Sequence, residues 1–402
     1  MKILFADKFP GSGLSTIREM GYECDYQPEL TAESLPDAIA GNQILVVRST
    51  QVTLETIEAS DVLAMVIRAG AGTNTIDKGA AAQRGIYVSN VPGKNALAVA
   101  ELAIGLILAI DRNIPDNVAD LRAEVWNKSK WSKTEGIHGR TLGIIGLGDI
   151  GIAVAERAAA FGMELVSIQR SGRDKLTMRR IEDLDVQLVP DVHQLAEMSD
   201  VVTLHVPYNE ETHHLIDATF LAHMKPGAVL INTSRGEVVD EPALLAAMDD
   251  KGIRAGLDVF WNEPKDGSGT FTSALAQHPN TYGTHHIGAS TEQAQRAIAD
   301  GVIDILTAFA RGRALNAVNL ANDSLSAATV TIRHYDKVGV LAEVLGVLRR
   351  ADLNVEQMDN TIFDGARAAV ATIHIAGDVP TDLGDRLNDL DNVIYAAVRR
   401  SQ

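Results

Sequence analysis

The chain has little cysteine and little positive charge, and each shortage narrows the range of possible functions. A single cysteine, Cys24, among 402 residues excludes an intrachain disulfide and any metal site built from several cysteines. We therefore expect a reducing, cytoplasmic location, no metal site, and a core position for Cys24 rather than a nucleophilic role. The formal net charge of −17 argues against nucleic acid or an anionic membrane as a partner.

Long hydrophobic runs are also missing. A membrane-spanning helix needs roughly 18 apolar residues, and the longest run, residues 96–110, is shorter and carries Glu101 near its centre. It predicts a buried helix at a domain or subunit contact. The apolar stretch within residues 1–11 is too short for a secretory signal and predicts a first strand.

The length and the hydrophobic pattern predict several α/β domains. A chain of 402 residues is too long for one ordinary core. Short β-branched runs alternate with longer helical patterns, which is typical of a parallel sheet covered by helices on both faces. The expected strands are residues 3–7, 44–48, 65–68, 142–147, 165–168, 201–206, 229–233 and 255–259.

The pattern changes after a polar stretch at residues 321–327, which we expect to be a linker. Beyond it, a βαββαβ order at residues 328–402 predicts a small ferredoxin-like α+β module. Its expected strands are residues 328–333, 355–363, 368–375 and 393–398, and its expected helices are residues 339–351 and 381–389.

A glycine-rich turn marks a dinucleotide site. Gly146, Gly148 and Gly151 have the spacing G-x-G-x-x-G directly after a predicted strand and at the start of an alanine-rich helix. The first glycine permits a tight turn, the second admits the pyrophosphate, and the third allows close packing of helix and strand. The free N–H groups of the helix would bind the diphosphate.

The residue that usually selects NAD is missing. An acidic side chain about 20 positions further on normally binds the ribose 2′-hydroxyl of NAD. This chain has Gln169 and Arg170 there, followed by Arg173. A guanidinium suits a 2′-phosphate, so one hypothesis is that NADP is accepted. The alternative is that both arginines are solvent-exposed and Gln169 binds the ribose of NAD.

Three polar residues, Arg235, Glu263 and His286, each follow a predicted strand. Ligands of parallel sheets bind at the carboxyl edge, so we expect these side chains to converge there. A guanidinium can hold a carboxylate, an imidazole can exchange an alcohol proton, and a carboxylate can orient the imidazole. The set predicts hydride transfer at C2 of a small anionic 2-hydroxy acid, with a nicotinamide (NAD or NADP) carrying the hydride.

Eight segments, in chain order, resemble the D-isomer-specific 2-hydroxyacid dehydrogenases. They are VVRSTQVT, RAGAGTNTID, NVPGKNALAVAELAIGLILA, VWNK, GLGDIG, TSRGEVVDEPAL, DVFWNEP and HIGASTEQAQ. The resemblance implies Arg235, Glu263 and His286 as the catalytic trio. The family has proline before the catalytic histidine where this chain has His285, and we choose His286 because Ile287 and the residues after it keep the family's register.

The resemblance also implies a domain plan and binding residues. A Rossmann-type nucleotide domain at residues 99–289 is inserted in a flavodoxin-like substrate domain at residues 1–98 and 290–320. With the glycine motif, the residues expected along the cofactor are Gly146, Gly148, Asp149, Ile150, Gly151, Gln169, Arg170, Val206, Pro207, Thr233, Ser234, Arg235, Asp258, His286 and Gly288. Those expected at the substrate are Arg48, Ser49, Arg68, Ala71, Gly72 and Lys128.

Two basic clusters are candidates for attracting an anion, and each is otherwise a solvated face. One is the pair Arg48 and Arg68. The other contains Arg122, Lys128, Lys130 and Lys133. The helix at residues 96–110 resembles one that supports a tight dimer in the family, so a homodimer or homotetramer is expected.

The C-terminal module resembles an ACT domain, a unit that senses small molecules. In related dehydrogenases it binds L-serine between subunits, and the matching positions are His334, Asp336 and Asn354. Serine-regulated relatives usually have asparagine where Asp336 stands, and its carboxylate would repel the carboxylate of serine. Regulation by L-serine and a purely structural, oligomerising module both stay open.

Three functions remain open from the sequence. The first is oxidation of 3-phospho-D-glycerate to 3-phosphooxypyruvate on the route to L-serine. The second is an NADP-linked reductase of glyoxylate, hydroxypyruvate or another 2-keto acid. The third, of another class, is a nucleotide-sensing scaffold without catalysis.

Overall fold

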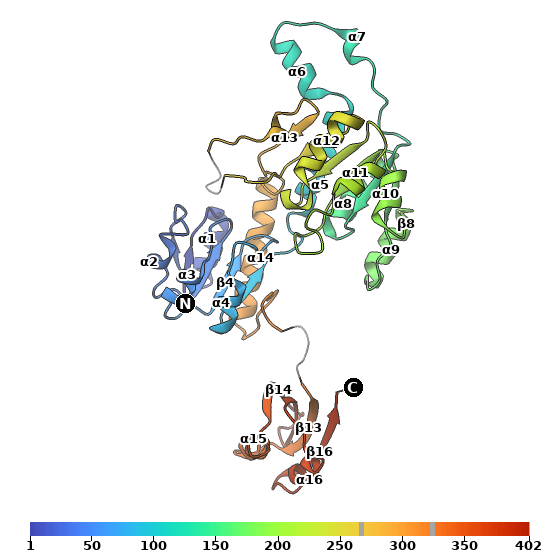
Figure 1. Ribbon diagram of the computed structural model, residues 1–402. Helices are drawn as coiled ribbons and strands as arrows, with labels where there is room; N and C mark the ends of the chain where they lie inside the picture. Colours follow the sequence, from blue (N-terminus) through green and yellow to red (C-terminus); the bar gives the residue numbers. More distant parts are fainter. Residues whose placement is uncertain (265–268, 322–325, 402) are drawn as a thin grey trace. The chain divides into compact units, whose positions relative to one another are not determined.

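A computed structural model describes residues 1–264, 269–321 and 326–401 of the chain (Figure 1). These residues divide into two units, Met1–Asn319 and Leu320–Gln402. Part of the expected linker, residues 322–325, lies outside the described residues. The predicted fold class is confirmed: two parallel sheets covered by helices are followed by an antiparallel α+β module.

The first sheet has the strand order β2-β1-β3-β4-β5, which is the flavodoxin-like order. Its strands are β1 (Lys2–Phe5), β2 (Glu23–Tyr26), β3 (Ile44–Val47), β4 (Met65–Arg68) and β5 (Tyr87–Asn90). Its helices are α1 (Gly11–Glu19), α2 (Leu35–Ala38), α3 (Leu54–Ala59) and α4 (Lys78–Gln83). We call this sheet with its helices the first lobe.

The second sheet has the order β12-β11-β10-β9-β6-β7-β8, with every strand parallel. Its strands are β6 (Thr141–Ile145), β7 (Glu164–Ile168), β8 (Gln187–Val189), β9 (Val201–Leu204), β10 (Val229–Asn232), β11 (Arg254–Leu257) and β12 (Thr281–Gly283). The order reverses between β6 and β9, as in dinucleotide-binding folds. This sheet and its helices form the second lobe.

Helices cover both faces of the second sheet. They are α5 (Ala96–Asp111), α8 (Asp149–Ala160), α9 (Lys175–Asp183), α10 (Val192–Met198), α11 (Ala218–His223), α12 (Glu241–Lys251) and α13 (Ala274–Gln277), with a short 3₁₀ turn at Gly236–Val238. The expected apolar helix is α5, and it packs on β10, β11 and α8. No helix in the described part of the chain is long and apolar enough to cross a membrane.

The chain crosses back to the first lobe through α14 (Glu292–Phe309). Ile298, Val302 and Ile305 of this helix share one core with Ile3 and Phe5 of β1. Cys24 is half-buried and packs against the same core. The first lobe is therefore built from both ends of the Met1–Asn319 unit, with the second lobe between them in sequence.

The C-terminal unit has the predicted βαββαβ order. Its elements are β13 (Ala328–Tyr335), α15 (Val340–Arg350), β14 (Asn354–Ile362), β15 (Ala368–Ala376), α16 (Leu383–Asn388) and β16 (Val393–Arg400). The sheet order is β14-β15-β13-β16, and each neighbouring pair is antiparallel. Its core is separate from those of the two lobes.

The hydrophobic pattern missed four strands, β2, β5, β8 and β12. All four are edge strands of three or four residues, and most of their residues are not buried. They therefore lack the continuous apolar run by which the inner strands were found. Several inner strands also end before the predicted position, so that residues such as Asp258 lie in the loops beyond them.

Candidate active site

A histidine and a carboxylate meet beyond the carboxyl edge of the second sheet. His286 Nδ1 lies 2.7 Å from Glu263 Oε2, and Glu263 Oε1 accepts the backbone N–H of Phe260 at 2.9 Å. Burial acts to raise the pKa of Glu263, but the His286 and Phe260 hydrogen bonds and the His286 and Arg235 charges leave it lowered. Glu263 therefore stays ionised and can orient the ring, leaving Nε2 for chemistry.

A buried aspartate holds the loop that carries His286. Asp258 is only 1% exposed, and its Oδ1 accepts the Thr284 hydroxyl at 2.6 Å and the Ile287 N–H at 2.8 Å. Its Oδ2 accepts the Gly288 N–H at 2.9 Å, and its carbonyl accepts the His286 N–H at 2.7 Å. His286 sits in the left-handed region with φ 52°, which this bonding maintains.

Asp258 and Gly288 were expected along the cofactor, and here they bind each other across the loop. The neighbouring His285 is exposed and is not part of the His286–Glu263 pair. His286 is exposed as well, so its hydrogen bond to Glu263, and not burial, supports the choice of His286 over His285.

Arg235 lies on the loop after β10, close to the first lobe. The side chain of Asn232, the last residue of β10, donates to the Arg235 carbonyl at 2.8 Å and accepts from the Ser234 N–H at 2.9 Å. A Cβ atom placed on Gly72 would lie 2.5 Å from Arg235 Nη2, so the guanidinium lies against the Gly72 backbone. The structure thus brings together two predicted substrate and catalytic residues from different lobes.

Two more guanidiniums lie near Arg235. Burial, followed by the charges of Arg235 and Arg48, lowers the pKa of Arg68 to about 10, and Asp7 acts against this shift. Burial also lowers the pKa of Arg48. Arg68 Nε is buried and has no hydrogen-bond partner among the described residues. These three guanidiniums repel one another, and the charge of Asp7 offsets that repulsion only in part. Such a cluster favours the binding of an anionic ligand.

Asp7 organises the loop that carries the predicted substrate residues Arg48 and Ser49. Its Oδ2 accepts the backbone N–H groups of Arg48, Ser49 and Thr50 at 2.6, 3.1 and 3.1 Å. The Ser49 hydroxyl donates to its Oδ1 at 3.2 Å, and Arg48 Nη2 donates to Ser290 Oγ at 3.3 Å. On β5, Asn90 donates to the carbonyl of Ala71, another predicted substrate residue, at 2.6 Å.

The glycine turn has the geometry that a diphosphate needs. Gly146 has φ 101°, and a Cβ on Gly151 would lie 1.9 Å from the Gly146 carbonyl oxygen. A Cβ on Gly148, by contrast, would meet no described atom within 4 Å, so the backbone is open to a ligand. Gly148 caps α8 without a side chain, which leaves the first-turn N–H groups available.

Other residues at the same edge have unpaired polar atoms. Thr233 Oγ1, of a predicted cofactor residue, and His205 Nδ1, which was not predicted, are buried and lack hydrogen-bond partners among the described residues. Such orphaned polar atoms fit a ligand that supplies polar groups. Val206 and Pro207 follow β9, Ile150 packs on the core of the second lobe, and the Asp149 carboxylate lies against the Gly93 backbone.

The expected ribose position holds two cations. Gln169 and Arg170 follow β7, and Arg173 Nη2 donates to the Ile168 carbonyl at 2.8 Å. Burial, and next the charge of Arg170, lowers the pKa of Arg173. Arg173 is thus folded back on the strand, and Arg170 is the exposed cation of the pair.

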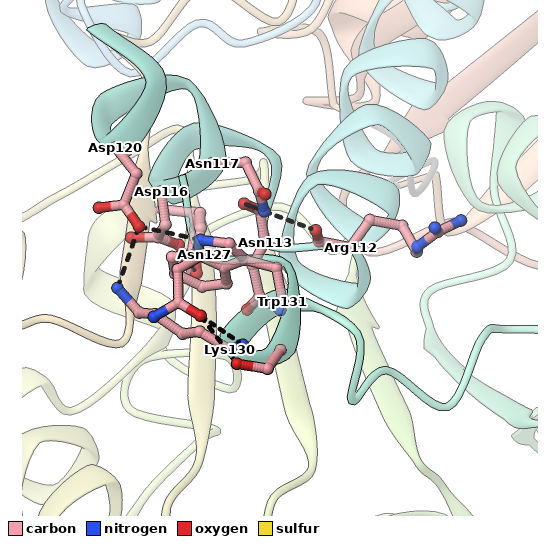
Figure 2. A network of polar contacts seen from close by, with 10 residues as sticks. Arg112, Asn113, Asp116, Asn117, Asp120, Asn127, Lys130 and Trp131 are labelled. Carbon is pink, nitrogen blue, oxygen red and sulfur yellow. Dashed lines mark hydrogen bonds and ion pairs between the residues drawn. The ribbon is translucent and has the colours of Figure 1, made fainter. Parts of the chain in front are cut away.

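Lys128 lies on an arm that the trio does not touch. The arm contains α6 (Ile114–Arg122) and α7 (Lys128–Trp131) and projects from the second lobe (Figure 1). Figure 2 shows its polar network, in which Asp120 binds Lys130 at 3.3 Å and the Trp131 indole at 2.9 Å. Lys128 itself is exposed, so the structure does not bring it to the other predicted substrate residues.

The predicted effector residues are spread over the C-terminal sheet. His334 is 2% exposed, and its Nδ1 and Nε2 face the Tyr335 carbonyl at 2.8 Å and Asn360 Oδ1 at 3.1 Å. It pairs with Ala369, whereas Asn354 pairs with Ala376, seven residues further along β15. At roughly 3.3 Å per residue this is about 23 Å, so one module alone cannot bring both residues to one small ligand. Asp336 is exposed.

Sequence reasoning missed Asp7, Asn232 and His205. Asp7 was visible only as the end of a predicted strand, and Asn232 preceded the more conspicuous Arg235. No group of three or more His, Cys, Asp or Glu side chains in the described ranges is arranged to hold a metal ion.

The fold and the site define a class of dehydrogenase, and comparisons with known proteins agree. The model of the family described as D-isomer specific 2-hydroxyacid dehydrogenase, NAD binding domain, matches residues 104–288. The hydroxypyruvate reductase of Thermotoga maritima is 40% identical over 277 residues, which are 68% of this chain and 87% of that protein. The chain belongs to the D-isomer specific 2-hydroxyacid dehydrogenase family.

Another similar protein is a D-3-phosphoglycerate dehydrogenase. That of Methanocaldococcus jannaschii is 40% identical over 327 residues, which are 80% of this chain. The chain spans 60% of the length of that relative and of the Synechocystis D-3-phosphoglycerate dehydrogenase. Among solved structures, an acyclic imino acid reductase in complex with NADPH and D-Arg matches with a TM-score of 0.69 at 28% identity, covering 79% of this chain and 100% of that one.

Proposed function

We propose that the protein oxidises 3-phospho-D-glycerate at C2 to 3-phosphooxypyruvate with a nicotinamide dinucleotide. One observation carries the proposal: three guanidiniums, Arg48, Arg68 and Arg235, cluster beside the His286–Glu263 pair. One cation suffices for the carboxylate of a simple 2-hydroxy acid. The additional two suit a second anionic group on the substrate, and the name of the M. jannaschii relative agrees with this.

The proposed chemistry at C2 follows from the geometry of these side chains. Arg235 binds the substrate carboxylate and polarises the C2 oxygen, and His286 Nε2 takes the hydroxyl proton. Glu263 fixes the ring through Nδ1 and stabilises the charge that the ring gains. A nicotinamide, when bound, accepts the hydride that leaves C2. In the reverse direction His286 returns the proton to the C2 oxygen.

The domain plan expected from the sequence supports this arrangement. Residues 1–98 and 290–320 supply Arg48, Arg68 and Gly72, and we assign them the substrate. Residues 99–289 supply the glycine turn and the trio, and we assign them the cofactor. The contact between Gly72 and Arg235 supports a position for both ligands at the junction of the lobes.

The activity test compares three acids. The protein is incubated separately with 3-phosphoglycerate and oxidised nicotinamide, and with hydroxypyruvate or glyoxylate and reduced nicotinamide. The absorbance of the reduced nicotinamide is followed in each case. The highest kcat/KM is expected with 3-phosphoglycerate. A higher value with hydroxypyruvate or glyoxylate would establish the reductase alternative, which the T. maritima relative's name supports. Absence of turnover with all three would favour a nucleotide-sensing scaffold.

For the cofactor we propose that NADP is accepted alongside NAD. The support is the absence of a carboxylate at Gln169 and Arg170 and the exposed guanidinium of Arg170. The test is the ratio of kcat/KM for the two cofactors. A strong preference for NAD would overturn acceptance of NADP and leave Gln169 as the group that binds the ribose.

We further propose a homodimer or a higher oligomer in which the arm is covered by another copy. Neither α6 nor α7 has a buried residue, and Leu121 and Trp126 are 57% and 81% exposed. Asp120 of α6 binds Lys130 and Trp131 of α7, which links the two helices of the arm (Figure 2). Exposed apolar side chains on such a segment favour a protein partner. Sedimentation of a Leu121→Glu/Trp126→Glu variant should give a monomer, and an unchanged oligomer would exclude the arm.

L-serine regulation is proposed only across two copies of the C-terminal module. His334 and Asn354 are far apart along β15. A single L-serine could therefore contact both only if the two residues came from different chains. Titration of L-serine against the initial rate tests it. A flat response would leave the module a structural, oligomerising one.

A further inference from the structure

Trp261 joins the loop of Arg235 to the loop of Glu263. A Cβ on Gly236 would lie 2.4 Å from the Phe260 carbonyl carbon and 2.8 Å from the Trp261 nitrogen, so the two loops touch through their backbones. The Trp261 indole N–H donates to the Gly236 carbonyl at 3.2 Å. The same residue therefore contacts the segment immediately after the catalytic arginine.

A second contact anchors the Trp261 backbone. Its N–H donates to Glu241 Oε1 at 2.7 Å, and Glu241 is the first residue of α12. Burial, and in addition the charge of Glu237, raises the pKa of Glu241. The hydrogen bond from the Trp261 N–H acts against this shift, so it compensates part of the cost of desolvating the carboxylate.

The indole ring is also held by stacking. It lies parallel to the His214 ring, with a centroid distance of 5.2 Å and an interplanar angle of 13°. His214 stacks in turn on His213 at 3.9 Å, and its backbone N–H donates to the Glu237 carbonyl at 3.0 Å. Loops that follow β9, β10 and β11 therefore meet at one indole.

Glu263 lies next to the point where these three loops meet at the Trp261 indole. Glu263 follows Trp261 by two residues, and its Oε1 accepts the N–H of Phe260, the neighbour of Trp261. Its other oxygen holds His286. We propose that Trp261, anchored by Glu241, is a positioning residue that sets the His286–Glu263 pair relative to Arg235. This inference rests on the proposed dehydrogenase function and adds to it a residue that touches neither substrate nor cofactor.

The kinetic test uses paired variants. Trp261→Ala removes both the ring and the indole N–H, and kcat should fall about 10- to 100-fold, as for a small misplacement of reacting groups. KM and the dissociation constant of the cofactor should change little, because the binding residues stay. Trp261→Phe, which keeps a stacking ring, should be intermediate. Glu241→Gln keeps the acceptor and should remain within about threefold of wild type, whereas Glu241→Ala should resemble Trp261→Ala.

A general loss of stability is separated from misplacement by a control and by a spectrum. Tyr26→Ala removes an exposed aromatic ring from the end of β2 and should leave kcat unchanged. The Nδ1 proton of His286, shared with Glu263, should give a downfield proton resonance that disappears in His286→Asn. That resonance should shift or broaden in Trp261→Ala and persist in Glu241→Gln.

The outcomes are distinguishable. Wild-type kcat and an unchanged resonance in Trp261→Ala would overturn the positioning role even if the variant melts at a lower temperature. If the wild-type protein turns over none of the acids, the dehydrogenase function fails, and the resonance still decides whether Trp261 controls the His286–Glu263 contact.

Discussion

Charged side chains gather at both edges of the second sheet, but their partners differ. At the amino edge a polar cavity of about 470 Å³ is lined by residues that include Asp111, Arg140, Asp200 and Lys225. Arg140 pairs with Asp111 at 3.5 Å, and Lys225 pairs with Asp200 at 2.8 Å. These side chains bind one another and join the starts of strands to α5, which is a structural role.

At the carboxyl edge the cations face one another instead. Arg48, Arg68 and Arg235 lie together, and the nearby Asp7 is occupied by backbone N–H groups. Thr233 Oγ1 is buried without a partner among the described residues. A set of charges is therefore present at both edges. Only the unpaired groups distinguish the edge that is built for a ligand.

The largest expected effect tests the reacting imidazole of the carboxyl edge. His286→Ala should lower kcat by about 10²- to 10⁴-fold, because proton exchange at the C2 oxygen is lost. His285→Ala is the matched control and should keep most of the activity, since His285 is not part of the His286–Glu263 pair. The steady-state rate with 3-phosphoglycerate measures both. The reverse ranking of the two variants would contradict the assignment.

The next effect compares Arg68, which lies among other cations, with Arg140, which pairs with Asp111. Arg68→Met should raise the KM for 3-phosphoglycerate by about 10- to 100-fold, the loss expected for hydrogen bonds to a charged group. The KM for glyoxylate, which has no phosphate, should change little. Arg140→Met, at the amino edge, should lower the melting temperature and leave both KM values unchanged. Equal losses for the two acids in Arg68→Met would show that Arg68 does not bind the phosphate.

A smaller effect concerns the cation at the end of β7. Arg170→Ala should lower kcat/KM for NADPH by about tenfold and leave kcat/KM for NADH unchanged, because only the 2′-phosphate needs the guanidinium. Gln169→Asp should shift the preference toward NADH. If Arg170→Ala affects both cofactors equally, Arg170 is not a selector of the 2′-phosphate.

The smallest effect concerns stability at the amino edge. Burial by itself would raise the pKa of Asp200, but hydrogen bonds from Lys225 and the Thr141 N–H, with the Lys225 and Arg140 charges, leave it lowered. The ionised carboxylate therefore stabilises the fold above the unfolded-state pKa of 3.8 and loses this contribution as the pH falls through the lower folded value.

Near neutral pH, Asp200→Asn should consequently melt at a lower temperature than wild type. This gap between the two melting temperatures should narrow as the pH falls below 3.8. Thermal melts over a pH series measure the gap, and kcat near neutral pH serves as the control and should not change. A gap that stays constant with pH would contradict the lowered pKa.

The sequence sufficed for features whose signal is local. The glycine turn was visible because its three glycines lie within six residues of one another and follow an apolar run. The convergence of Arg235, Glu263 and His286 was predicted from positions after strands of one parallel sheet, although β12, the strand before His286, was itself missed. The contact of His286 with Glu263 agrees with that argument, while the catalytic roles stay predictions.

Features that depend on distant partners were not predictable. Asp7 acts on Arg48, 41 positions away, and Trp261 donates to Gly236, 25 positions away. His334 was expected at an effector, and that role stays a prediction; its burial continues the inward alternation of Val330 and Ile332 on β13. A strict two-residue period would have placed it in the core, and the match to a motif outweighed that pattern.

Asp258 has a consequence for the exchange of backbone hydrogens. The side chain of Ile287 is 46% exposed, yet its amide and that of Gly288 both donate to the buried Asp258 carboxylate. In deuterium oxide these two amides should be protected far longer than a surface loop normally allows. The segment that carries His286 would then open on the timescale of the sheet beneath it rather than on that of a loop.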